Sequence, residues 1–181
     1  MDPFYSECRA YGRLIEAKVN GKVAINCHGY LTLPAEKEDQ LRRDFNVANW
    51  DRPDDEYSRP ASKREPFRAI LKDLVTEDTL FTPKVAKKIL RDLKRIRKLG
   101  VYTMDVTARN YKGGLLVDFG IALTEPHYLF FIKPLWQVQC YQHDDLLSFD
   151  GMMEDEGILT WERALPNHEY CKKLRSHKSE Q

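Results

Sequence analysis

The sequence has few cysteines and no long apolar run, and these absences exclude several classes of protein. Its four cysteines lie far apart without a Cys-x-x-Cys pair, so neither a zinc site nor a redox pair is indicated. We expect reduced thiols, most of them packed, in an intracellular protein of the nucleus or cytoplasm. No apolar stretch approaches the roughly 20 residues that cross a bilayer, and the first residues show no signal-peptide pattern. We therefore expect no membrane association.

An excess of charge of one sign is also missing. The 29 basic and 28 acidic side chains of the 181 residues leave a net charge of +1. This balance argues against a globally basic nucleic-acid binder and against an acidic solvating tail. The five histidines show no ligand spacing and are interpreted as packing or surface residues. Core anchors are predicted at Trp50, Trp136 and Trp161.

Periodicity and punctuation divide the chain into helices, extended segments and one insertion. Apolar residues at three- and four-residue steps predict helices over 4–18, 83–99 and 134–147. Runs rich in apolar and β-branched residues predict extended structure over 22–33, 67–75 and 128–132. Prolines and charges over 34–66 predict a loop-rich insertion with a short helix around 36–45. The chain is thus predicted to be an α+β domain over residues 1–160, followed by a C-terminal segment, 161–181, with a basic and frayed tail.

The predicted helix 83–99 has clear boundaries and an unusually basic outer face. Thr82 is a good N-cap, Pro83 suits the first turn and Gly100 follows the end. The apolar seam consists of Val85, Ile89, Leu93, Ile96 and Leu99. The remaining face carries eight cations against the single acid Asp92: Lys84, Lys87, Lys88, Arg91, Lys94, Arg95, Arg97 and Lys98. A solvated helix face and a surface for an anionic partner, either acidic protein or nucleic acid, both fit this pattern.

One stretch has the residue pattern that phosphoryl transfer needs. Asp105 precedes Asn110 as Asp-x-x-x-x-Asn, and Asp118 of an Asp-Phe-Gly triplet follows eight residues after Asn110. In that chemistry one carboxylate accepts the proton of the attacking hydroxyl, while an amide oxygen and a second carboxylate hold magnesium on the nucleotide phosphates. Magnesium prefers oxygen ligands and keeps several waters, which suits so few protein ligands. Because Asp and Asn also favour tight turns whatever their function, a purely structural loop is the alternative.

In these residues the chain resembles the catalytic core of the protein-kinase-like fold. The run Asp105-Val-Thr-Ala-Arg-Asn110 is similar to the Asp-Leu-Ala-Ala-Arg-Asn of tyrosine kinases, whereas the short spacing to Asp118 is more like that of aminoglycoside phosphotransferases. The resemblance implies that Asp105 is the catalytic base and that Asn110 and Asp118 bind Mg²⁺ together with ATP. Helix 83–99 is similar to the long helix that precedes the catalytic loop.

The resemblance also implies roles for two segments outside this loop. The strand 67–75 is similar to the one that leads into the adenine-binding hinge, which gives Asp73, Leu74 and Val75 as nucleotide contacts. The first helix is similar to the regulatory helix whose glutamate pairs with the phosphate-binding lysine, and Glu7 holds the corresponding position. A surface salt bridge is the alternative role for Glu7.

A closer likeness rests on four segments. They are Asp-Pro-Phe-Tyr at the start, Glu-Cys-Arg-Ala-Tyr-Gly-Arg-Leu, the strand Phe67-Arg-Ala-Ile-Leu-Lys-Asp-Leu-Val75 and Leu-Val-Asp-Phe-Gly. In these segments the chain resembles a fungal family of kinase-like domains named after a subunit of an inner-kinetochore complex. This resemblance implies a kinetochore-associated protein with protein partners.

The chain departs from a complete kinase in ways that affect catalysis. No Gly-rich loop and no strand-borne lysine precede the first helix, Thr103-Met104 stands where kinases have His-Arg, and no Ala-Pro-Glu follows Asp-Phe-Gly. Phosphoryl transfer depends on positioning and electrostatics, and each lost charge-stabilising donor costs roughly 10²–10³ in rate. We therefore expect a shortened, pseudokinase-type module that acts as an interaction or scaffold protein, with weak or no binding of ATP and magnesium.

Three further expectations stay open at this stage. The first is an active Mg-ATP phosphotransferase that uses Asp105, Asn110 and Asp118. The second is an electrostatic binder of nucleic acid or acidic protein through the helix 83–99. The third is an oligomer that forms through the exposed edge of the strands predicted over 22–33 and 67–75.

Overall fold

The computed structural model describes residues 2–47, 56, 58–158 and 163–165. Helices and short antiparallel strands make the chain α+β, as its sequence predicts. It forms two compact units, Met1–Asn26 with Leu74–Gln181 and Cys27–Asp73, each of which is considered by itself. None of the helices in the described part of the chain combines the length and apolar character needed to cross a membrane. The predictions for Trp50, Trp161 and most of the C-terminal segment lie outside the described residues.

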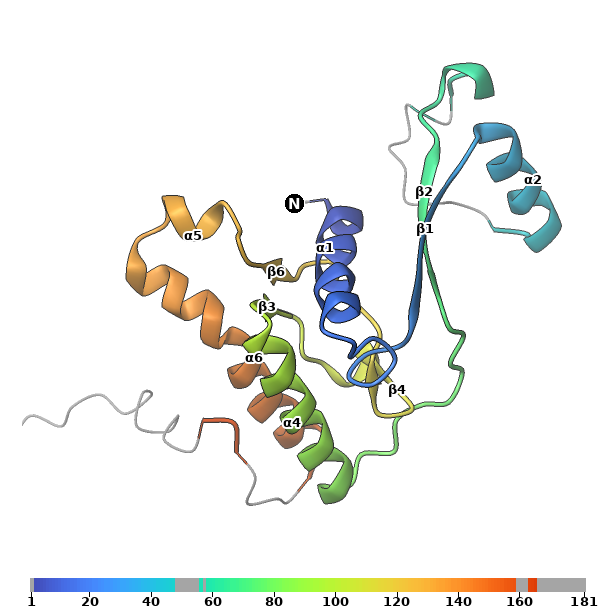
Figure 1. Cartoon of the computed structure of the whole chain (residues 1–181). Helices are drawn as coiled ribbons and strands as arrows, with labels where there is room; N and C mark the ends of the chain where they lie inside the picture. Colours follow the sequence, from blue (N-terminus) through green and yellow to red (C-terminus); the bar gives the residue numbers. More distant parts are fainter. Residues whose placement is uncertain (1, 48–55, 57, 159–162, 166–181) are drawn as a thin grey trace, which may run out of the picture. The chain divides into compact units, whose positions relative to one another are not determined.

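The smaller unit consists of a two-stranded ribbon and one longer helix (Figure 1). β1 (Cys27–Leu33) pairs antiparallel with β2 (Phe67–Lys72), and the register shifts at the start of β1. α2 (Ala35–Phe45) follows β1 after Pro34, where the sequence predicts a short helix within the insertion. A single 3-10 turn, η1 (Ala61–Lys63), precedes β2. Both strands are shorter than predicted, since β1 does not include 22–26 and β2 does not include 73–75.

α1 (Pro3–Glu16) opens the larger unit and ends two residues earlier than predicted. The Asp2 carboxylate accepts a hydrogen bond from the Phe4 amide at 3.0 Å and so caps the helix start. Beyond the helix, Lys18 adopts a left-handed backbone (φ 57°) and the chain turns. The Ile25 amide then donates to the Leu116 carbonyl oxygen at 2.9 Å. Residues 22–26, predicted as part of a long strand, are therefore a turn followed by a bridge to the larger unit's own sheet.

α4 (Pro83–Lys98) follows the predicted boundaries to within one residue. Its N-cap is Thr82, whose hydroxyl oxygen accepts from the Val85 amide at 3.3 Å. The buried side of α4 is made of Ala86, Ile89, Leu90, Asp92, Leu93 and Ile96. Gly100 ends the helix with a φ of +74°, and a Cβ at this position would lie 3.0 Å from Cβ of Glu125. Only glycine suits this close approach without displacing Glu125.

Two small antiparallel sheets follow α4. β3 (Val101–Tyr102) pairs with β6 (Leu123–Thr124), and β4 (Tyr111–Lys112) forms a hairpin with β5 (Leu115–Leu116). The 3-10 turn η2 (Ala108–Asn110) leads into β4. The loop between β3 and β4 and the segment between β5 and β6 thus both start from short, paired strands, which hold their ends in place.

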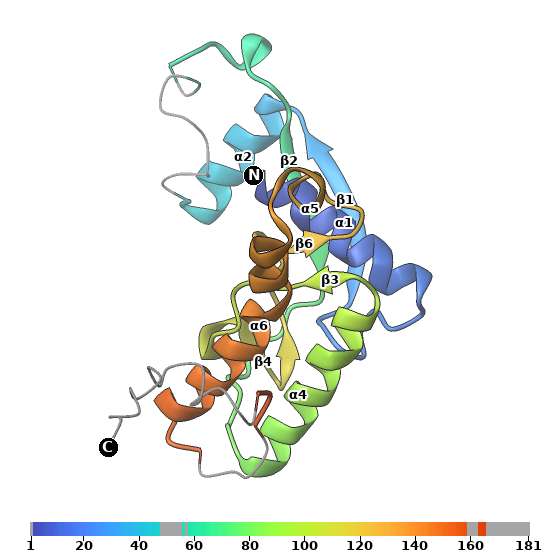
Figure 2. The ribbon, with the colours of Figure 1, turned by 90° about the vertical axis from the view of Figure 1, so that its left-hand side faces the viewer.

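The end of the described chain is helical rather than extended. α5 (Leu129–Ile132) occupies the segment predicted as a strand, and that prediction is wrong because the Ile132 and Lys133 amides bond back to the carbonyls of Tyr128 and Leu129. α6 (Leu135–Asp155) runs eight residues beyond its predicted end. This extension buries Phe149, Met152 and Met153. α4 and α6 lie side by side in both views of the ribbon (Figures 1 and 2). Trp136, at the start of α6, is 66% exposed, so its predicted role as a core anchor is wrong.

Candidate functional site

The loop after β3 holds Asp105 and Asn110 together by backbone and amide hydrogen bonds. The Asn110 Nδ2 donates to the Asp105 carbonyl oxygen at 3.1 Å, and the Val117 amide donates to the Asn110 carbonyl oxygen at 2.9 Å. The second bond links the loop to the residue that precedes Asp118. Asn110 is buried, whereas Asp105 is partly exposed and Asp118 is exposed. Within the larger unit, the structure therefore joins the three predicted site residues through one short hydrogen-bonded path.

Arg109 places a cation beside the candidate catalytic base. Its Nη2 lies 3.3 Å from Oδ2 of Asp105, although the guanidinium itself is largely exposed to water. The carboxylate of Asp105 is thus a partly exposed proton acceptor with a positive charge next to it.

The Asp-Phe-Gly segment is held against the first helix. The Phe119 amide donates to Oε1 of Glu7 at 3.1 Å, and the Phe119 ring meets the Tyr11 ring edge to face at 5.1 Å. Asp118 turns the chain, since its Oδ1 accepts from the Gly120 amide at 2.6 Å. Glu7 is buried, so its alternative role in a surface salt bridge is wrong. The sequence pattern did not predict this contact between Glu7 and the backbone, because nothing in the sequence links the two positions.

α1 also binds the end of β6 and the two residues after it through two arginines. Arg9 donates to the carbonyl oxygen of Thr124 at 2.7 Å and to that of Pro126, and Arg13 donates to that of Glu125 at 3.0 Å. Charged donors make these bonds stronger than those between neutral groups. One helix therefore fixes both the Asp-Phe-Gly segment and the chain that follows β6.

The residues expected at an adenine-binding hinge are divided between the two units. Asp73 belongs to the smaller unit, where its carboxylate lies 2.6 Å from Nε2 of His28. Leu74 and Val75 belong to the larger unit. Leu74 is exposed, and a methyl of Val75 lies 3.5 Å from the position of a Cβ on Gly113, at the turn between β4 and β5. Of the three predicted contacts, the structure thus places Val75 at the hairpin that follows Asn110.

The oxygen donors present are those that magnesium prefers. The hydrogen bond to Asp105 uses the Asn110 amide nitrogen and not its oxygen, and Asp118 keeps a second carboxylate oxygen beyond the one bonded to Gly120. Asn110 and Asp118 would hold the ion, which would neutralise charge on nucleotide phosphates. Among the described residues no three His, Cys, Asp or Glu side chains gather as a metal cluster. A magnesium site made of one amide oxygen, one carboxylate and the nucleotide phosphates would not need such a cluster, because it has only one of these side chains.

A buried charge lies on α6, at its contact with α4. Asp145 is fully buried, with one carboxylate oxygen bonded to Arg97 and the other without a hydrogen-bond partner among the described residues. Burial raises the pKa of Asp145 to about 6, although Arg97 acts in the opposite direction. Burial also raises the pKa of Tyr111, at the start of the hairpin, and the charges of Asp145 and Asp92 add to the effect. Sequence reasoning missed this group, because the pair joins positions 48 residues apart.

Exposed apolar side chains are concentrated over α5 and the first turn of α6. Five of them, between 60% and 77% exposed, are Tyr128, Phe131, Ile132, Leu135 and Trp136. We call residues 128–136 the apolar segment. The uninterrupted run Tyr-Leu-Phe-Phe-Ile was the available signal, but it was interpreted as a strand. The segment is the largest group of exposed apolar side chains along the described sequence.

The fold and site define an α+β chain whose Asp-x-x-x-x-Asn loop and Asp-Phe-Gly segment are held in one unit against its first helix. Residues 1–123 match the model of a family described as the kinetochore Sim4 complex subunit FTA2, and the chain belongs to this family. The match includes Asp105, Asn110 and Asp118. No curated protein and no solved structure matches the chain. The predicted link to a family named after a kinetochore subunit is confirmed, whereas the kinase-like fold stays a prediction.

Proposed function

We propose that this chain is a nuclear, kinetochore-associated interaction subunit built on a kinase-like core, rather than an efficient phosphotransferase. The family is named for a subunit of a kinetochore complex, which supports protein partners and a role at chromatin. The single observation that carries the interaction role is the apolar segment 128–136. Contiguous exposed apolar side chains are rare on proteins that act alone and mark protein–protein contacts.

The composition of the apolar segment fits a protein contact. It presents one tryptophan, one tyrosine and one phenylalanine, in Trp136, Tyr128 and Phe131, and aromatic side chains supply much of the binding energy at interfaces. Tyr128 immediately precedes α5, and the other side chains lie on α5 and α6, which fix their spacing. A partner that covers them removes their apolar surface from water, which favours association.

Contacts in the larger unit support the kinase-like core. A long helix precedes the loop, Asn110 bonds across the loop to Asp105, and Glu7 on the first helix bonds to the Asp-Phe-Gly segment. Along the chain, the first helix, the long helix, the loop and the Asp-Phe-Gly segment follow one another in the order that the resemblance implies. One feature argues against efficient catalysis: Thr103-Met104 stands where kinases have His-Arg.

The interaction role is tested by removing the apolar segment's side chains in fungal cells. We expect a fluorescently tagged chain to form foci with a centromere marker, and we expect Phe131→Ser with Trp136→Ser to disperse them. The matched control is Tyr30→Ser with Leu80→Ser, which removes equally exposed apolar side chains elsewhere and should keep the foci. A wild-type chain that never meets the centromere marker, or foci that persist in the first variant, would overturn the proposal.

A second candidate function, Mg-ATP-dependent phosphotransfer, is favoured by the hydrogen-bonded loop. Asp105 would accept the proton of the attacking hydroxyl, and Asn110 with Asp118 would hold the metal on the phosphates. The first test is thermal stabilisation by ATP with magnesium, in the wild type and in Asp118→Asn. A ligand at 100 times its dissociation constant adds about 2.7 kcal/mol. A magnesium-dependent shift that Asp118→Asn abolishes, with phosphate transfer lost in Asp105→Ala, would establish the enzyme. If millimolar ATP with magnesium does not raise the melting temperature, phosphotransfer is refuted and the interaction role is the remaining proposal.

Self-association through the small sheet is a separate proposal. The ribbon of β1 and β2 has two strands in the described part of the chain, so each strand has an edge without a partner strand. Pairing between copies at this edge predicts a mass by light scattering that rises with concentration. A constant monomer mass would refute it.

A further inference from the structure

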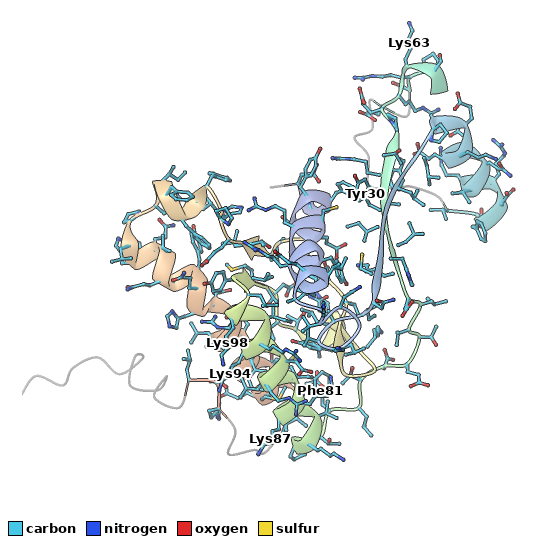
Figure 3. All side chains as sticks on the ribbon, viewed as in Figure 1. Tyr30, Lys63, Phe81, Lys87, Lys94 and Lys98 are labelled. Atoms are coloured by element: carbon cyan, nitrogen blue, oxygen red, sulfur yellow. The ribbon has the colours of Figure 1, made fainter. Side chains whose placement is uncertain are left out.

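The outward face of α4 concentrates positive charge on a chain that is nearly neutral overall. Six of its cations are exposed: Lys84, Lys87, Arg91, Lys94, Arg95 and Lys98. With 3.6 residues per turn, these six positions fall within an arc of roughly 100° around the helix axis. They extend over the whole length of the helix, as the labelled side chains of Lys87, Lys94 and Lys98 show (Figure 3).

Asp92 is the single acidic side chain of α4, and it neutralises the positive charge at one position of this face. Asp92, which is buried, lies 2.8 Å from Nζ of Lys88 and 3.5 Å from Nε of Arg91. Lys88 also donates to the Gly114 carbonyl oxygen at 2.9 Å, so its charge is already used in contacts within the folded chain. Of the other five exposed cations, Lys84, Lys94, Arg95 and Lys98 form no ion pair within the ranges that the structure describes. Their charge is therefore available to a ligand.

The spacing of these cations makes them repel one another when no anionic ligand is bound. Like charges recur four residues apart in the pairs Lys84–Lys88, Lys87–Arg91, Arg91–Arg95 and Lys94–Lys98. Such pairs destabilise a helix, whereas opposite charges at the same spacing stabilise it. An anionic ligand along α4 relieves this repulsion, and binding therefore gains more than the direct contacts alone.

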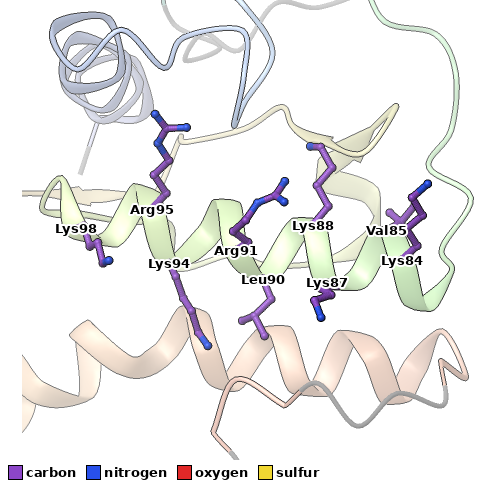
Figure 4. Close-up of a pocket in the computed structure, with 9 residues that line it drawn as sticks. All are labelled: Lys84, Val85, Lys87, Lys88, Leu90, Arg91, Lys94, Arg95 and Lys98. Carbon is purple, nitrogen blue, oxygen red and sulfur yellow. The ribbon is translucent and has the colours of Figure 1, made fainter.

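The face is also hollowed and partly apolar. Nine residues of α4 line an open hollow of about 950 Å³, among them Val85 and Leu90 on either side of the cations (Figure 4). In this view Arg91 and Arg95 project from one side of α4, while Lys94 and Leu90 project toward α6. The long aliphatic stems of the lysines add apolar surface beneath their charged ends.

We propose that α4 docks an acidic amphipathic segment of a partner protein along this face. Glutamates or aspartates at three- and four-residue steps on a partner helix match the steps at which cations recur from Lys84 to Lys98, and an apolar side chain covers the partly exposed Val85. This inference rests on the proposed interaction role and adds the chemistry of one partner. It uses a surface separate in sequence from the apolar segment, so either can fail alone.

Acidic protein fits these observations better than nucleic acid does. A nucleic-acid binding domain typically has a pI above about 9, whereas this chain has a sequence pI of about 7.7 and 28 acidic residues. Phosphate backbones offer nothing to the apolar residues that border the cations. A peptide with mixed acidic and apolar side chains uses both parts of the hollow.

The test measures binding of two labelled probes to the full chain by fluorescence anisotropy. One is a helical peptide of about 20 residues, which spans roughly 30 Å and so covers α4, with glutamates at three- and four-residue steps beside leucines. The other is a DNA duplex of similar length. The test variant is Lys84→Gln with Arg91→Gln and Lys98→Gln, since glutamine keeps a good helix propensity. The control removes three exposed cations from the other unit: Lys37→Gln, Arg43→Gln and Lys63→Gln.

We expect the peptide to bind the wild type and the control equally and the α4 variant about tenfold more weakly, because three exposed ion pairs are lost together. A version of the peptide with glutamine for glutamate should not bind. Tighter binding of the duplex than of the peptide, with a steep loss in salt, would overturn the proposal in favour of nucleic acid. Absence of peptide binding, or equal weakening by both triple variants, would also overturn it. Circular dichroism must show the same helix content in all three proteins. Centromere foci that persist in an α4 variant with weakened peptide binding would show that the docking site on α4 and the proposed kinetochore role can be tested separately.

Discussion

Replacing Asp145 with asparagine tests whether the buried carboxylate on α6 destabilises the folded chain at neutral pH. Asp145 is fully buried, and its pKa is raised from an ordinary 3.8 to about 6. The folded chain therefore holds the proton more tightly than the unfolded chain does. The stabilising contribution of this group is fully present below pH 3.8 and is lost as the pH rises through about 6. At 1.36 kcal/mol for each unit of pKa, the full loss is about 3 kcal/mol.

Two effects compete in Asp145→Asn, and their magnitudes decide the expected sign. Breaking a buried ion pair costs 3–5 kcal/mol when it leaves a charge alone. Arg97, however, also donates to the Gln142 carbonyl oxygen and is partly exposed. The amide imitates the protonated carboxyl, which is the form that burial favours. We therefore expect the variant to be about 1–3 kcal/mol more stable than the wild type at pH 7.5, and equal to it near pH 4.

The measurement is urea unfolding followed by circular dichroism at several pH values between 4 and 8. Asp144, whose pKa burial also raises, adds a pH dependence of the same sign to both proteins. Asp155→Asn makes the same chemical change at an exposed position of α6 and should leave stability unchanged at every pH. If Asp145→Asn loses 3 kcal/mol or more at pH 7.5, the ion pair with Arg97 stabilises the fold and the reasoning from burial is refuted.

Two further changes test the packing of the helices. Tyr11→Leu removes the ring that meets Phe119 edge to face in the core and should cost about 2 kcal/mol in thermal unfolding, whereas the same change at the exposed Tyr5 should cost almost nothing; equal effects would contradict the packing described. Thr82→Ala removes the N-cap of α4 and should cost about 1 kcal/mol, while Thr82→Ser should restore most of it, and an unaffected melting temperature in the alanine variant would show that this cap contributes nothing.

The sequence predicts α4 and the loop around Asp105 well, because both depend on local signals. Thr82, Pro83 and Gly100 punctuate α4, and the short spacing from Asp105 to Asn110 places both in one loop before any tertiary contact is known. α1 and α2 also lie where apolar spacing and proline punctuation indicate.

The remaining features depend on contacts between distant parts of the chain. A short apolar run such as 128–132 suits a buried strand or a helix equally, since periodicity cannot separate the two over so few residues. The structure shows α5 there, and it leaves Trp136 exposed where a core position was predicted. The pairing of Glu7 with the Phe119 amide joins positions 112 residues apart, and no local pattern encodes it.

The hydrogen bond between Glu7 and Phe119 has a consequence for communication across the larger unit. α1 contacts the Asp-Phe-Gly segment through Glu7 and Tyr11, and it contacts the chain at the end of β6 through two arginines, so its displacement must break several contacts at once. Any molecule that fixes the backbone at Phe119 also restricts α1. Linkage is reciprocal, so if a ligand at Asp118 restricts α1, a protein that binds the exposed side of α1, at Tyr5 or Ile15, would change the affinity for that ligand by the same factor. α1 would thus couple binding of a protein on its exposed side to binding of a ligand at the Asp-Phe-Gly segment.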